Sequence, residues 1–361
     1  MLTALAALLV AAPGAPLTPP EERELRNRIQ AALFAAGPAP ALAPETHGQF
    51  EPVPGVIAER VTFGTQFGMR VPAILYRPHT LSAKAPGFIV VNGHGGDKYS
   101  WYAFYTGILY ARGGAVVLTY DPAGEGERNI DRKSGTRAHD KVEPPTELAE
   151  RLGGLMMTDV MQAAGYLSQR PEVDAQRIGA AGYSMGSFVL SLACAVEPRL
   201  KACVLVGGGN LDGDGGYWDN SKPMCQGGPY QSLRFLGDRP AALYALHASR
   251  GPTLVYNGLE DTTVQIPRHG EPHFRDLQAR VAKLRGSAAG VFETGFVAGV
   301  GHRPYFVTKP VVEWLERRLD FPRWTVDSIG AMPETHVSQW AKEHGVDMDP
   351  LYATEHREGG A

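Results

Sequence analysis

The 361-residue sequence has few cysteines, little net charge and no long apolar segment beyond its first residues. Cys194, Cys203 and Cys225 are too few for a disulfide framework, and their spacing matches no zinc motif. Cys194 falls in a helix-like run and Cys203 in a strand-like run, so we expect both to be small buried apolar residues. A net charge of −3 gives no electrostatic reason to bind nucleic acid or an anionic membrane.

A hydrophobic content of 43% with 20% charged residues is typical of a globular protein, and the length allows a sizeable core. Leu2–Ala12 is an apolar run with the length of a signal-peptide core, and it is too short to cross a bilayer. The small residues Ala12-Pro13-Gly14 follow, although no Lys or Arg precedes the run. We expect residues 1–14 to be a signal peptide and the protein to be secreted or periplasmic; the alternative is a cytoplasmic protein with an Ala-rich leader.

The chain then changes its pattern twice. Residues 15–55 predict a helix from Pro19 to about Phe34 and a Pro/Ala-rich linker, and Val56–Gln66 with Arg70–Tyr76 predict an antiparallel hairpin. From Pro86 onward, apolar strand-like runs alternate with helix-like runs. This alternation indicates an α/β fold with a mostly parallel central sheet and helices on both faces. We expect a catalytic domain over 56–320 and a polar tail over 321–361 with a short helix at Glu334–Glu343.

The segment Gly182-Tyr183-Ser184-Met185-Gly186 lies between a strand-like run, 177–181, and a helix-like run, 187–194. It matches the G-x-S-x-G nucleophile elbow, in which a sharp strand-to-helix turn exposes the serine hydroxyl. A Cβ at Gly182 or Gly186 would collide with neighbouring backbone in such a turn. The pattern therefore predicts that Ser184 is a catalytic nucleophile.

A serine nucleophile needs a base and an orienting carboxylate, and the elbow fold supplies them in the order Ser, acid, His. Asp261 follows a strand-like run that ends at Tyr256, and His302 lies between the last predicted strand and the last predicted helix. We predict Asp261 as the acid, with its neighbour Glu260 as a rival, and His302 as the base. The other histidines of this half, His247, His269 and His273, are expected to be surface or structural residues.

Two backbone amides should form an oxyanion hole. One is the amide of Met185, the residue after the nucleophile. The other is expected from the loop Asn92-Gly93-His94-Gly95-Gly96, where we favour His94 and keep Gly95 as the neighbouring alternative. The His94 side chain could also suit a metal, but the sequence offers no partner ligands at suitable spacing. We therefore expect no metal and no cofactor.

Two further motifs are weaker. The glycines of 121–128 suggest phosphate binding, but their spacing fails the dinucleotide and P-loop templates, so we expect a structural turn at the rim of the site. Residues 210–215 resemble the start of a calcium loop, yet Ser221 stands where a bidentate Glu would be needed. The insert 210–238 is instead expected to be a polar lid over the site mouth.

Taken together, the motifs resemble the α/β-hydrolase superfamily, in the branch of acetyl xylan esterases and dienelactone-hydrolase-like proteins. The resemblance covers about residues 56–320 and rests on the 92–96 loop, the Asp121-x-x-Gly124-x-Gly126 turn, the elbow, Leu259-Glu260-Asp261 and Gly301-His302. Asn92 replaces the His that many relatives carry there. Ser184 replaces the cysteine nucleophile of dienelactone hydrolases proper.

The resemblance implies a serine carboxylic-ester hydrolase with an acyl-enzyme intermediate, no cofactor and a small-molecule or carbohydrate ester as substrate. Acetylated carbohydrate is the expected substrate class. The alternative enzyme is a serine peptidase of the prolyl-oligopeptidase type, although residues 16–55 are too short for the accessory propeller of such enzymes. A catalytically silent binding protein of this fold would usually have a broken triad, whereas all three triad residues occur here.

Overall fold

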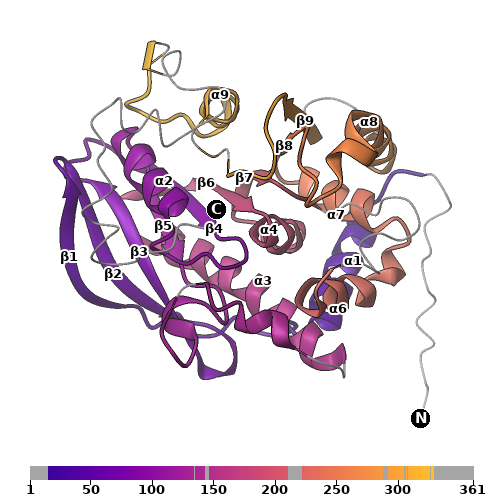
Figure 1. Cartoon of the computed structure of the whole chain (residues 1–361), viewed down its shortest axis with the longest axis horizontal. Coiled ribbons are helices and arrows are strands. Elements are labelled where there is room, and N and C mark those ends of the chain that lie inside the picture. The colour runs from indigo at the N-terminus through magenta and orange to yellow at the C-terminus, as the bar shows by residue number, and fades with distance from the viewer. Residues whose placement is uncertain are drawn as a thin grey trace.

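A nine-stranded mixed sheet forms the centre of the protein (Figure 1). The computed structural model describes residues 15–133, 135–142, 146–209, 222–287, 292–304, 306, 308–325 and 327–328. The strand order is β1-β2-β3-β5-β4-β6-β7-β8-β9. The strands are β1 (Glu45–Val53), β2 (Val56–Gly64), β3 (Arg70–Pro78), β4 (Ala85–Val91), β5 (Val116–Tyr120), β6 (Val173–Tyr183), β7 (Leu200–Val206), β8 (Thr253–Gly258) and β9 (Phe292–Val297).

The sheet is antiparallel at one end and parallel over the rest. The pairs β1–β2, β2–β3 and β3–β5 are antiparallel, and β5 through β9 pair in parallel. The described helices are α1 (Pro19–Ala32), α2 (Trp101–Arg112), α3 (Thr146–Gln169), α4 (Met185–Val196), α6 (Met224–Ser232), α7 (Arg239–Ala248), α8 (Ile266–Arg285) and α9 (Lys309–Leu319). None of the helices in the described ranges is both long and apolar enough to span a membrane.

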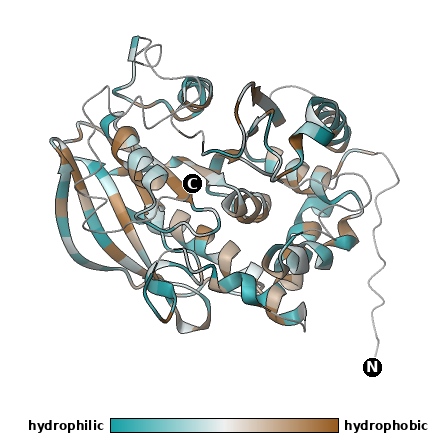
Figure 2. Ribbon diagram, in the orientation of Figure 1, coloured by the Kyte–Doolittle hydropathy of each residue, from teal (hydrophilic) through white to brown (hydrophobic). Residues whose placement is uncertain are grey.

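Successive side chains along each strand point to opposite faces of the sheet and belong to two apolar clusters, one on each face. In β4, Ile89 and Val91 belong to the cluster covered by α3, α4, α7 and α8, whereas Phe88 and Val90 belong to the cluster covered by α2 and α9. Figure 2 shows the resulting pattern: α4 is largely apolar, and α8 carries much hydrophilic surface. The predicted α/β architecture with helices on both faces is confirmed.

Two sequence-based expectations need correction, and three others concern residues outside the described ranges. Glu45–Val53, expected to belong to the linker, forms the edge strand β1; most of its side chains are exposed, so backbone pairing with β2 rather than an apolar pattern defines it. Cys194 and Cys203 are buried as expected, but they form a disulfide between α4 and β7. The predicted signal peptide, residues 210–221 of the insert and the predicted helix Glu334–Glu343 lie outside the described residues.

The beginning of the predicted polar tail packs against α2. The ring of Trp324 stacks on that of Phe321 with centroids 4.0 Å apart, and it meets Tyr110 edge-on at 5.1 Å. The backbone N–H of Arg323 donates to the carbonyl of Gly113 at the end of α2. Aromatic packing and this hydrogen bond therefore extend the folded unit past residue 320.

Candidate active site

The G-x-S-x-G segment forms the turn between β6 and α4. Ser184 is the N-cap of α4 and has φ 53° and ψ −117°, a combination that non-glycine residues rarely adopt. A Cβ on Gly186 would lie 2.2 Å from the carbonyl oxygen of Val91, and one on Gly182 would lie 2.4 Å from the carbonyl oxygen of Gly186. The close approach of β4, β6 and α4 thus requires glycine on both sides of the serine.

Asp261 and His302 meet beyond the carboxyl ends of β8 and β9. Oδ2 of Asp261 lies 2.7 Å from Nδ1 of His302, and its Oδ1 accepts the backbone N–H groups of Thr263 and Val264. The Asp261 side chain is fully buried, whereas the rival Glu260 is exposed. A carboxylate fixed by three hydrogen bonds orients the imidazole and leaves Nε2 of His302 available as a base.

The turn after β7 brings the elbow and the histidine together. A Cβ on Gly207 would lie 3.1 Å from Cε1 of His302, and one on Gly208 would lie 3.3 Å from the carbonyl oxygen of Ser184. The ring of Tyr183 lies 4.9 Å from that of His302, and its hydroxyl donates to the His302 carbonyl. The three residues predicted as a triad therefore gather at the carboxyl ends of the parallel strands, where ligands bind in open α/β sheets.

The loop after β4 lies against the elbow. A Cβ on Gly93 would lie 3.1 Å from the Cβ of Ser184. The amides of three loop residues have acceptors: Gly93 donates to the Tyr102 hydroxyl, Gly95 to Glu125 Oε1 and Gly96 to the carbonyl of Gly93.

Among the described residues, the amide of His94 has no acceptor within hydrogen-bond distance. At the start of α4, Met185 likewise has no carbonyl one turn earlier in the helix to receive its N–H. Both amides can therefore donate to a bound group. Gly95, the alternative to His94, already donates its N–H to Glu125.

Two carboxylates that the sequence analysis did not assign hold this loop. Asp121 accepts the backbone N–H of Lys98 at 3.0 Å and pairs with its ammonium group at 2.7 Å, and Glu125 accepts the amides of Gly95 and Arg137. Burial raises the pKa of Glu125. Burial, reinforced by the charge of Asp121, raises the pKa of Asp97 to about 7.

Although burial alone would lower the pKa of Lys98, its ion pairs with Asp121 and Glu127 raise that pKa. The segment 121–128 thus supports the loop after β4, as well as forming the structural turn that the sequence predicts. The glycine spacing of this segment does not predict this role, because the supporting groups are carboxylates that contact a loop distant in sequence.

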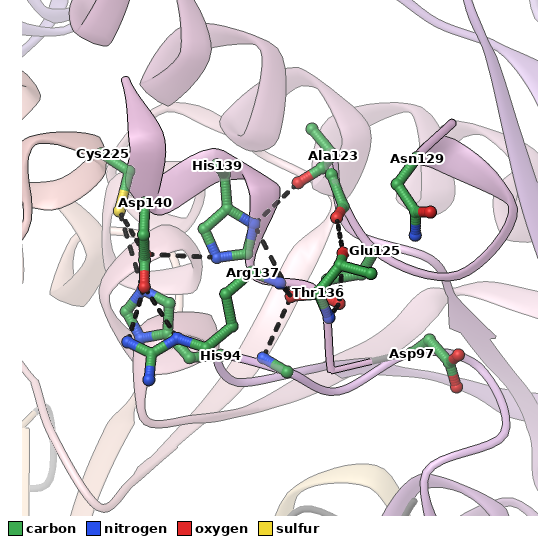
Figure 3. Close-up of polar contacts among 12 residues, drawn as sticks. His94, Asp97, Ala123, Glu125, Asn129, Thr136, Arg137, His139, Asp140 and Cys225 are labelled. Carbon is green, nitrogen blue, oxygen red and sulfur yellow. Dashed lines mark hydrogen bonds and ion pairs between the residues drawn. The ribbon is translucent and has the colours of Figure 1, made fainter. Parts of the chain in front are cut away.

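The side chain of His94 lies in a polar cluster with His139, Asp140 and Cys225 (Figure 3). Its Nε2 lies 2.9 Å from Oδ1 of Asp140 and 3.6 Å from Sγ of Cys225, and its ring stacks on that of His139. Burial, together with the nearby His94, lowers the pKa of His139 to about 4. The sequence offers His94 no partner ligands at suitable spacing, but the fold places His139, Asp140 and Cys225 beside it.

Comparison with family models identifies the chain. The model described as the prolyl oligopeptidase family matches residues 146–327, about half of the sequence, and these residues include the elbow, Asp261 and His302. The chain belongs to the prolyl oligopeptidase family. The model described as acetyl xylan esterase (AXE1) matches residues 48–206, which include the elbow and the loop after β4. The predicted resemblance to the acetyl xylan esterase branch is confirmed.

A curated relative matches part of the chain. The thiohydrolase apmlB of Arthrinium phaeospermum is 26% identical over 157 residues, which are 42% of this chain and 43% of that protein. The chain thus spans less than half the length of this curated relative.

Among solved structures, the methylesterase BT1017 superposes with a TM-score of 0.60 at 20% identity, covering 92% of this chain and 75% of that one. The acetyl xylan esterase from Paenibacillus sp. R4 has a TM-score of 0.54 at 16% identity and covers 85% and 97%. The protein therefore has the α/β-hydrolase fold, with an open sheet rather than a barrel.

Proposed function

We propose that the protein is a serine carboxylic-ester hydrolase that acts through an acyl-enzyme intermediate. The hydrogen bond between Asp261 Oδ2 and His302 Nδ1, beside the strained Ser184 turn, carries this proposal. Such an arrangement combines a nucleophile, a base and an orienting carboxylate, and the chain order is that of elbow hydrolases.

In the proposed reaction, Ser184 Oγ attacks the ester carbonyl carbon while Nε2 of His302 takes the hydroxyl proton. The negative charge that develops on the carbonyl oxygen receives hydrogen bonds from the amides of Met185 and His94. Collapse of the tetrahedral intermediate breaks the ester bond, and His302 returns the proton to the leaving alcohol. A water molecule, deprotonated by His302, then hydrolyses the acyl-enzyme and regenerates Ser184.

We further propose acetylated carbohydrate as the substrate class. The match of residues 48–206 to the acetyl xylan esterase model supports this choice, since that region contains both the elbow and the proposed oxyanion loop.

Turnover of p-nitrophenyl acetate, butyrate and octanoate by the wild type and Ser184→Ala tests the proposal. We expect activity greatest on acetate, and a loss of at least about 10⁴-fold in kcat on removal of the nucleophile. Ser168→Ala is a matched control, because the Ser168 hydroxyl donates to the Gly165 carbonyl of its own helix. Wild-type turnover no greater than that of Ser184→Ala would overturn the esterase assignment.

The prolyl oligopeptidase match favours a second candidate function, hydrolysis of peptides by the same residues. The two candidates differ in their leaving group, which is an alcohol for the ester and an amine for the peptide. Assays of the wild type and Ser184→Ala on a chromogenic peptidyl-prolyl amide distinguish the two candidate functions. Peptide turnover that depends on Ser184 and exceeds ester turnover would replace the first candidate with the second.

We also propose that the protein is exported to an oxidising compartment. The disulfide between Cys194 and Cys203 supports export, because disulfides persist in such compartments and are rare in the cytosol. The apolar run Leu2–Ala12 is the proposed export signal. Intact-mass measurement of the protein from a bacterial periplasm should show loss of the leader and an oxidised cysteine pair; full-length, fully reduced protein would contradict export.

A further inference from the structure

Four side chains capable of binding a metal converge beside the loop after β4, outside the proposed triad. We propose that His94, His139, Asp140 and Cys225 form a binding site for a divalent metal ion of the zinc type. Neither the family matches nor the resemblance assigns a metal to this fold position. The proposal stands independently of the esterase function.

The donor atoms of His94, His139 and Asp140 are close enough to share one ion, and the Cys225 sulfur lies beside two of them. The ligand atoms of His94, His139 and Asp140 all lie within 4.8 Å of one another. Oδ1 of Asp140 lies 2.9 Å from His94 Nε2, 3.6 Å from His139 Nε2 and 3.3 Å from Cys225 Sγ, and that sulfur lies 3.6 Å from His94 Nε2. Bonds of about 2.0–2.3 Å around a tetrahedral zinc ion separate its ligands by roughly 3.3–3.6 Å.

His139 provides the observation that points to a ligand. Its side chain is fully buried, and its Nε2 has no hydrogen-bond partner among the described residues. Its Nδ1 lies 2.9 Å from the carbonyl oxygen of Ala123. An Nδ1–H that donates to this carbonyl leaves the lone pair of Nε2 facing the Asp140 carboxylate, which is unfavourable without a cation between them. A backbone carbonyl on the outer nitrogen is also the usual support of a metal-binding histidine.

The remaining groups account for the charges around the site. Asp140 uses Oδ1 for the cluster, while its Oδ2 pairs with Arg137, whose side chain is half exposed. On metal binding the Cys225 thiol would release its proton to solvent, so thiolate and carboxylate together balance the charge of a divalent ion. Imidazole, carboxylate and thiolate donors select zinc or a similar transition metal over Mg²⁺ or Ca²⁺, which prefer oxygen ligands.

The proposed site would join three segments that are distant in sequence. His94 lies on the loop after β4, His139 and Asp140 lie on the 3₁₀ turn Ala138–Lys141, and Cys225 lies in the first turn of α6. Four protein ligands leave no open position for a substrate, so the metal would be structural. It would hold the loop whose His94 amide we propose as an oxyanion donor, and His94 would act there as a positioning residue.

Zinc binding by the metal-stripped full-length protein tests the proposal, with isothermal titration calorimetry and elemental analysis as readouts. We expect about one zinc ion per chain in the wild type. His139→Gln and Cys225→Ser should each weaken binding by about 100-fold or more, exceeding the usual effect of losing a supporting partner. His79→Gln, at an exposed histidine, is the matched control and should bind as the wild type does.

Cobalt substitution adds a spectroscopic test that starts from the wild type. Co²⁺ bound to the wild type should give a near-ultraviolet thiolate-to-metal charge-transfer band, and Cys225→Ser should lack it. Two results would overturn the proposal. One is no zinc binding by the wild type. The other is binding that survives His139→Gln but disappears in His269→Gln/His273→Gln, since those histidines lie four residues apart on α8 and could bind zinc adventitiously.

Discussion

Replacing Asp261 with asparagine is the sharpest test of the proposed triad, because the side chain keeps its shape and loses its charge. In the structure, Oδ1 of Asp261 accepts two backbone amides and Oδ2 faces Nδ1 of His302. Asparagine can keep the first oxygen in place, so its NH₂ group must then face the histidine. Because NH₂ is only a donor, Nδ1 has to become the acceptor, and the ring proton moves to Nε2.

The tautomer with a proton on Nε2 cannot accept the proton of Ser184. The expected loss in kcat is therefore on the order of 10⁴-fold, or about 5.5 kcal/mol of transition-state stabilisation, as found when a triad aspartate is changed in this way. KM should change little, since Asp261 is fully buried and does not reach a bound ester. Initial rates on p-nitrophenyl acetate over a range of concentrations measure both constants.

Glu260→Gln is the matched control. Glu260 is adjacent in sequence and has the same chemistry, but its side chain is exposed. We expect its kcat to stay within about threefold of the wild type, the range of an exposed surface change of about 0.5 kcal/mol. The reasoning would be refuted if Asp261→Asn kept more than a tenth of wild-type kcat, or if the large loss followed Glu260→Gln instead.

Three further predictions concern stability. The pKa of Asp97 is about 7 in the folded protein against an ordinary 3.8, so between these pH values the folded state keeps a proton that the unfolded chain has lost. The wild type should therefore lose stability relative to Asp97→Asn as pH rises from 3.8 to about 7. A difference in urea midpoint between the two proteins that is the same at both pH values would contradict this. Gly186→Ala should lower the free energy of unfolding in denaturant by about 3 kcal/mol, because the new Cβ would lie 2.2 Å from the Val91 carbonyl oxygen. A near-neutral effect would show that the elbow is less tightly packed than described. The Cys194–Cys203 disulfide closes a loop with a sequence separation of 9, so its removal should lower the free energy of unfolding by about 2–3 kcal/mol. Denaturation of the double alanine variant beside the wild type measures this loss. Equal denaturation midpoints would mean that the cysteines are not paired in the protein.

Features that depend on local pattern could be predicted from the sequence. The elbow is a five-residue motif between an apolar strand and an apolar helix, and its glycines are required by contacts that any such turn makes. The structure also brings Asp261 and His302 together, since both follow parallel strands and the carboxyl ends of such strands share one edge of the sheet. The choice between Asp261 and Glu260, by contrast, needed the structure, because only burial distinguishes adjacent carboxylates.

The sequence by itself determined the alternation of strands and helices after residue 86, the serine elbow and the candidates for acid and base, because each is encoded within a few consecutive residues. Only the tertiary structure decided the edge strand β1, the disulfide, the carboxylates that hold the loop after β4 and the cluster around His94. Its ligand atoms come from residues 94, 139, 140 and 225, and the contact between Cys225 and His94 spans 131 positions. No spacing rule covers such a separation, since the chain path between those residues, and not their order, brings the side chains together.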